Sequence, residues 1–74
     1  MYTVIFEQAE EGGFIASVPI LPGCVSQGET FEEARINIKD AIEGYVAVLK
    51  EDGDEIPTES PERIAATVAV PMLP

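Results

Sequence analysis

The side chains that could do chemistry in this 74-residue sequence are carboxylates and a single thiol. There are fourteen Asp and Glu residues, one Cys and no His. Without histidine, Ser–His and Cys–His nucleophilic pairs and histidine-ligated metal sites cannot form. Cys24 has no base or cation beside it in the sequence, so we expect a buried strand cysteine rather than a reactive thiol. No catalytic residue is predicted.

The carboxylates Asp52, Asp54 and Glu55 have the spacing closest to that of a cation site. They lack the loop spacing and the distal bidentate glutamate of an EF-hand, so we predict no metal site and no cofactor. A metal-dependent nuclease built from clustered carboxylates is the enzymatic alternative. It requires RNA cleavage that depends on Mg²⁺ or Mn²⁺ and that disappears when those carboxylates are neutralised. The residues favour a non-enzymatic, acidic binding domain.

The charge balance restricts the partners. Four basic residues against fourteen acidic ones give a net charge of −10. Direct nucleic-acid binding needs clustered Lys and Arg, which makes it a poor fit here. An acidic surface suits a basic protein partner, although plain solubility explains the charge equally well. The single cysteine excludes an intrachain disulfide, and no signal peptide or long apolar run is visible, so we expect a cytoplasmic protein without membrane contact.

Two strands are predicted at the start of the chain. Residues 2–8 and 14–18 are rich in β-branched and aromatic side chains and flank Gly12 and Gly13, which is typical of an antiparallel hairpin. Alternation places one apolar set on the face that a helix would cover: Val4, Phe6, Phe14, Ala16 and Val18. Ile5 and Ile15 fall on the opposite face. Since one helix cannot cover both faces, Ile5 and Ile15 indicate a further contact, with either a second copy or a partner. We predict that they mediate self-association into a homodimer or homotetramer.

The next stretch links the hairpin to a helix. Pro19 and Pro22 exclude helix, and Pro22-Gly23 is typical of a turn. Residues 24–27 are predicted as a short third strand that ends at Gly28. Thr30 is the expected helix N-cap: its hydroxyl would accept the Glu33 amide, and the Glu33 carboxylate would reach back to the Thr30 amide.

A long amphipathic helix is predicted for residues 31–52, closed by Gly53. Its apolar positions are spaced by three and four residues and define a buried face: Ala34, Ile38, Ala41, Ile42, Tyr45 and Leu49. Ile36 lies opposite that face. We predict that a protein partner contacts the exposed face at Glu32, Ile36, Asp40 and Glu43.

An acidic, proline-containing connector is expected after the helix, with one helical turn at Ser60-Pro61-Glu62. Residues 67–70 are predicted as a fourth strand that Pro71 ends. The expected architecture is a two-layer α+β fold of order β-β-β-α-β, an antiparallel sheet packed on one long helix. We expect residues 1–74 to form a single domain.

One stretch resembles a known family. The run from Gly13 to Ala34 contains Leu21-Pro22-Gly23-Cys24, then Gly28-Glu29-Thr30, and then a helix opened by Glu32-Glu33-Ala34. This pattern resembles the N-terminal domain of HicB antitoxins. The resemblance implies a partial ribonuclease H-like fold without the catalytic carboxylates of true nucleases. Six residues of the pattern form the fold motif: Leu21, Pro22, Gly23, Cys24, Gly28 and Thr30.

The resemblance also implies a function. HicB-like proteins neutralise HicA, a small basic toxin that cleaves messenger RNA, by covering its active site. Many family members carry a C-terminal DNA-binding domain, whereas this sequence stops at Pro74 without one; we therefore expect no direct operator binding. The alternative is an orphan HicB-like module that oligomerises and binds another protein or a small ligand.

Overall fold

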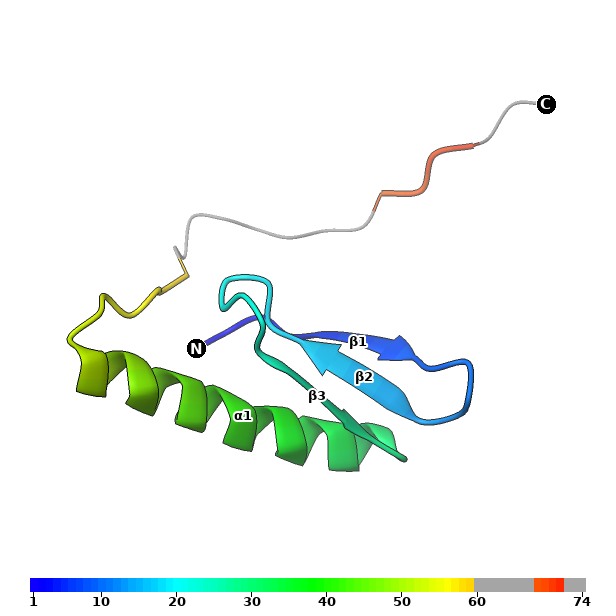
Figure 1. Ribbon diagram of the computed structural model, residues 1–74. Coiled ribbons are helices and arrows are strands. Elements are labelled where there is room, and N and C mark those ends of the chain that lie inside the picture. The colour runs from blue at the N-terminus through cyan, green and yellow to red at the C-terminus, as the bar shows by residue number, and fades with distance from the viewer. Residues whose placement is uncertain (60–67, 72–74) are drawn as a thin grey trace.

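The computed structural model describes residues 1–59 and 68–71 and has an α+β architecture. Three strands, β1 (Ile5–Gln8), β2 (Phe14–Ser17) and β3 (Val25–Gly28), precede one helix, α1 (Phe31–Asp52). The strands form one antiparallel sheet in the order β1-β2-β3, and α1 runs along it as the second layer (Figure 1). The predicted sheet and long helix are confirmed.

The register of the sheet decides which residues share a face. Phe6 pairs with Ala16, and Ala16 pairs with Ser26 on the far side. The turn between β1 and β2 is closed by two backbone hydrogen bonds, Ala9 N–H to Gly13 O and Gly12 N–H to Ala9 O, each 3.0 Å. Gly12 and Gly13 have φ of 101° and 79°, a region that favours glycine.

The first strand is shorter than predicted, because its predicted beginning bonds elsewhere. The Tyr2 hydroxyl donates to the Pro57 carbonyl at 2.7 Å. The Thr3 amide and hydroxyl donate to the two Glu59 carboxylate oxygens at 2.8 and 2.9 Å. The residues after the helix therefore return to the start of β1, across more than fifty positions of sequence.

The link between β2 and β3 is held by its own backbone. Val18 N–H donates to Cys24 O, Leu21 N–H to Val18 O, and Cys24 N–H to Leu21 O, at 3.0–3.1 Å. Gly23 has φ of 81°, as the turn requires. The Tyr45 hydroxyl of α1 donates to the Pro22 carbonyl at 2.8 Å, which ties this link to the helix.

The core lies between the sheet and α1. Its buried side chains come from the second strand, the link and the first half of the helix: Ala16, Val18, Leu21, Cys24, Ala34 and Ile38. The aromatic ring of Phe31 packs against Phe6 and Phe14, with ring centroids 4.6 and 6.0 Å apart. The predicted division of the hairpin into a covered and an open face is confirmed, since Ile5 and Ile15 are exposed.

Both ends of α1 are capped. Thr30 Oγ1 accepts the Glu33 amide at 3.0 Å, as predicted. The second half of the predicted capping box is wrong: the Glu33 carboxylate accepts the amide of Glu29 at 3.3 Å, one residue earlier than expected. Gly53 has φ of 71°, and the Gly53 and Asp54 amides donate to the last helical carbonyls.

The described part of the predicted fourth strand, residues 68–70, does not form a strand. Residues 68–70 have no strand pairing, and Val68 and Val70 are 78% and 76% exposed. A strand needs a neighbouring edge to satisfy its backbone groups, and these residues have none beside them. Thr67 and the predicted turn at Ser60-Pro61-Glu62 lie outside the described residues.

Candidate partner-binding site

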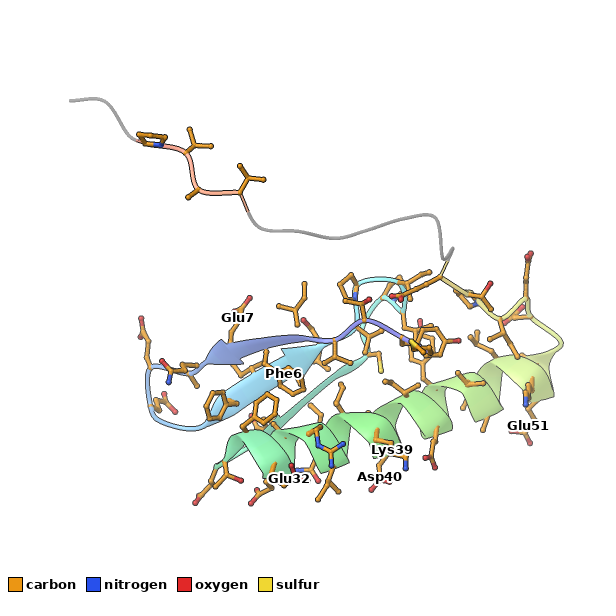
Figure 2. The ribbon with its side chains drawn as sticks, turned by 180° about the vertical axis from the view of Figure 1, so that it is seen from behind. Phe6, Glu7, Glu32, Lys39, Asp40 and Glu51 are labelled. Atoms are coloured by element: carbon orange, nitrogen blue, oxygen red, sulfur yellow. The ribbon has the colours of Figure 1, made fainter. Side chains whose placement is uncertain are left out.

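The predicted partner residues of α1 form one exposed stripe. Glu32, Ile36, Asp40 and Glu43 are all exposed, and helical spacing places them on the same side. Glu32 and Asp40 point away from the sheet (Figure 2). Ile36 is 52% exposed, so the stripe has an apolar side chain between carboxylates. We call these four residues the helix stripe.

Part of the charge of the helix stripe is neutralised by the helix itself. Arg35 donates to both Glu32 carboxylate oxygens, with Nη2–Oε1 at 2.7 Å and Nε–Oε2 at 3.1 Å. This hydrogen bonding, together with the opposite charge, holds the pKa of the Glu32 carboxyl below its ordinary value. Both side chains are more than half exposed, so the pair contributes little to stability. Glu32 should therefore attract a basic partner less strongly than Asp40 or Glu43 does.

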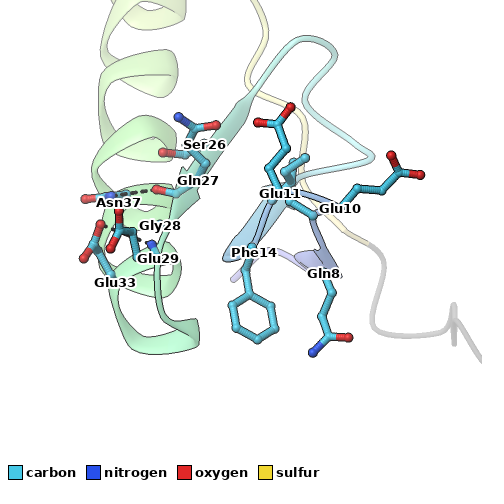
Figure 3. Close-up of a pocket in the computed structure, with 13 residues that line it drawn as sticks. Gln8, Glu10, Glu11, Phe14, Ser26, Gln27, Gly28, Glu29, Glu33 and Asn37 are labelled. Carbon is cyan, nitrogen blue, oxygen red and sulfur yellow. Dashed lines mark hydrogen bonds between the residues drawn. The ribbon is translucent and has the colours of Figure 1, made fainter.

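A second acidic surface, which the sequence did not reveal, is a hollow between the hairpin turn and the start of α1 (Figure 3). Four glutamates line this acidic hollow: Glu10, Glu11, Glu29 and Glu33. Among its described lining residues none is a lysine or an arginine. The negative charge of the acidic hollow is therefore less compensated than that of the helix stripe.

The acidic hollow exists because of the strand register. Phe14 pairs with Gly28, which sets the turn before β2 beside the residues that open α1. The Asn37 side chain donates to the Gln27 carbonyl at 2.7 Å and holds β3 to the helix at the same place. No local sequence pattern predicts this grouping of glutamates, because it depends on the register between the second and third strands.

The open face of the sheet carries the predicted self-association residues. Ile5 and Ile15 are 46% and 40% exposed, and Val25 beside them is 55% exposed. Ile5 and Val25 both pair with Ser17, from opposite sides, so they belong to the same face as Ile15. The sequence of the short third strand does not show which of its residues face the helix, so it does not predict that Val25 joins this face. We call Ile5, Ile15 and Val25 the open-face cluster.

The residues of the fold motif serve the link and the helix start. Leu21 is fully buried and Cys24 is 4% exposed, while Pro22, Gly23 and Thr30 are exposed and hold the turn and the N-cap. Burial raises the pKa of the Cys24 thiol, which disfavours its thiolate. Gly28 lies against the helix backbone, so that a Cβ there would clash with the Ala34 nitrogen.

Residues 1–59 and 68–71 were also compared with the geometry of a metal site and of a membrane-spanning helix. In this part of the chain, no three His, Cys, Asp or Glu side chains lie close enough together to hold a metal ion. Nor does the described structure contain a helix long and apolar enough to cross a membrane. What the described residues offer is exposed acidic and apolar surface on a small α+β fold.

The chain belongs to the HicB-like antitoxin family. The family model described as "HicB_like antitoxin of bacterial toxin-antitoxin system" matches residues 2–73. A UPF0150 protein of Thermoplasma acidophilum is 48% identical over 63 residues, which cover 85% of this chain and 91% of that protein. A UPF0150 protein of Synechocystis is 48% identical over 58 residues, 78% of this chain and 73% of that protein.

A relative with a functional name is longer than this chain. The protein named Antitoxin HicB 1 of Photorhabdus laumondii is 38% identical over 60 residues. The match covers 81% of this chain but 39% of that protein. The similarity therefore concerns one part of the longer antitoxin, and the fold residues of the motif lie within it.

Proposed function

We propose that this protein is a non-catalytic, cytoplasmic antitoxin that binds and neutralises a small basic toxin of the HicA type. Its family membership is the observation that carries the proposal. The net charge of −10 supports it, since a basic partner is attracted over long range by such a field. Covering the messenger-RNA-cleaving site of the toxin requires no chemistry from the antitoxin, in keeping with a sequence that lacks histidine.

The helix stripe is our proposed contact surface. Protein interfaces combine an apolar centre with a polar rim, and Ile36 with Asp40 and Glu43 offers that combination on a rigid helix. The acidic hollow offers more uncompensated charge. We assign the hollow to attraction of the partner and the stripe to the contact itself.

Co-expression with the small open reading frame adjacent to the gene tests the proposal. Affinity purification of this protein, followed by size-exclusion chromatography with light scattering, should yield a complex with a basic protein of fixed stoichiometry. The complex should protect messenger RNA from cleavage by that protein. The absence of an adjacent toxin-like frame together with the absence of a co-purifying basic protein would refute the antitoxin proposal.

Charge-reversal variants test the contact surface separately. Asp40→Lys with Glu43→Lys should weaken toxin binding by about tenfold or more, because like charges then face the partner. Glu51→Lys with Asp52→Lys, at the other end of the same helix, is the matched control and should change the affinity much less. Glu10→Lys with Glu11→Lys changes the acidic hollow. If only this last pair weakens the complex, the contact lies at the hollow and the helix stripe is the wrong surface.

We also propose that the open-face cluster mediates self-association. Three exposed aliphatic side chains lie together on a face that α1 does not cover. Replacing Ile15, which lies between Glu7 and Gln27 across the sheet, by lysine should shift the oligomer to a smaller species in light scattering. If the protein is a homo-oligomer and no basic partner binds, the orphan binding module becomes the better interpretation.

A further inference from the structure

The outer side of α1 carries a glycine that the packing of this chain does not require. Gly44 is exposed in the middle of the helix, and a Cβ built there would have open space within 4 Å. Unlike Gly53, it does not have a positive φ. Glycine in a helix interior costs stability relative to alanine. Since no contact within the described structure offsets this cost, the open space above Gly44 is a candidate for contact with another molecule.

Gly44 interrupts a ridge of exposed side chains on α1. Residues four positions apart form such ridges on a helix, and the ridge through Gly44 contains Ile36, Asp40 and Val48. All of these residues are exposed, and Ile36 and Val48 are more than half exposed. The ridge therefore has a gap with an aliphatic side chain toward each end. When two helices cross, the ridge of one helix packs into such a depression of the other.

The charges of α1 are separated around its axis. Asp40 lies one turn before Gly44 and about 40° from it around the helix, at about 100° per residue. The basic residues of the helix, Arg35, Lys39 and Lys50, lie about 120° or more from Gly44 on the opposite flank. A molecule that contacts the gap at Gly44 therefore meets a carboxylate rather than a cation. This charge favours a partner with Lys or Arg beside its apolar contact residues.

We propose that a helix of the basic partner crosses α1 at Gly44, with a large apolar side chain in the gap between Asp40 and Val48 and a Lys or Arg beside Asp40. This inference rests on the proposed function and extends the contact beyond the helix stripe, which ends at Glu43. The backbone groups in the middle of α1 are all used inside the helix. A bound strand would leave its own backbone groups unpaired there, whereas a helix satisfies them internally. A helix is therefore the occupant that fits this surface.

Filling the gap tests the proposal. Gly44→Ala should weaken binding of the toxin about threefold and Gly44→Leu about thirtyfold or more, because the added side chain holds the two helices apart. Neither variant should unfold the protein, since the space above Gly44 is open, and urea denaturation checks this. Gly44→Ala should thus bind more weakly although it is more stable, an outcome that a purely structural role would not give. Lys39→Leu, on the opposite flank, is the matched control and should change the affinity by less than about twofold.

The outcomes separate this inference from the proposed function. If the parent protein forms no complex with the toxin, the proposed function fails and this inference fails with it. If the parent protein binds and Gly44→Leu binds equally well, only this inference is overturned.

A photo-cross-linking residue identifies the occupant. Val48→benzoylphenylalanine places the reactive group at the far side of the gap and outside the helix stripe. In the complex, a cross-link to a helical peptide of the toxin is expected. A cross-link to a strand or loop of the toxin, or only to a second copy of this chain, overturns the proposal.

Discussion

Gly28 shows how one residue can fix the distance between the two layers. A Cβ at this position would clash with the Ala34 nitrogen and would lie 2.8 Å from the Glu33 carbonyl carbon. Both atoms belong to the helix backbone, which cannot rotate away as a flexible side chain can. Glycine is therefore required by close approach between β3 and α1, whereas the sequence suggested only that it ends a strand.

Gly28→Ala should therefore destabilise the protein by about 1–3 kcal/mol, because the helix must shift to admit the methyl group. Gly44→Ala is the matched control. No atom lies within 4 Å of a Cβ built there, so alanine should stabilise the exposed helix by about 0.5–1 kcal/mol. Urea denaturation of both variants measures the two changes in the free energy of unfolding. Equal midpoints would show that the sheet and helix are not in the close contact described.

The helix is the element that the sequence specified best. Its N-cap, its apolar face and its C-terminal glycine each involve contacts between residues at most four positions apart. Such short-range contacts can be predicted from the spacing of residues in the sequence. The Tyr2–Pro57 and Thr3–Glu59 hydrogen bonds join residues more than fifty positions apart. No local pattern contains such a contact, so the sequence predicts a strand from residue 2, whereas β1 begins at Ile5.

The same distinction separates the predicted from the unpredicted parts of the site. The helix stripe and Ile5 with Ile15 follow from helix and strand periodicity within single elements. The acidic hollow and the addition of Val25 to the open face need the register between strands. In a three-stranded sheet, register depends on the link of residues 18–24, whose hydrogen bonds only the structure shows.

Loss of the N-cap should weaken the helix by a measurable amount. Thr30→Ala removes the hydroxyl that accepts the Glu33 amide and should cost about 1 kcal/mol of stability. Thr58→Ala changes an exposed threonine in the connector and should stay within about 0.5 kcal/mol of the parent protein. Thermal unfolding followed by circular dichroism measures both. Thr30→Ser should restore most of the loss, since it retains the hydroxyl; a failure to do so would assign the effect to the threonine methyl instead.

At the scale of the whole molecule, the net charge of −10 acts in opposite directions on the two proposed associations. It attracts a basic toxin and repels a second copy of the same chain. Salt screens both effects, because the Debye length falls from about 30 Å at 10 mM to about 8 Å at 150 mM ionic strength. The same change of buffer therefore separates the two kinds of interface.

Raising the salt concentration over this range should slow association with the toxin by about tenfold and leave the dissociation rate almost unchanged, because steering acts on the encounter. The dissociation constant of the homo-oligomer should fall over the same range, since its interfaces are apolar and the copies repel each other less. Stopped-flow binding and analytical ultracentrifugation measure the two quantities, with sucrose at matched osmolality as the control for solvent effects. If salt weakened self-association instead, charged groups rather than the open-face cluster would hold the copies together.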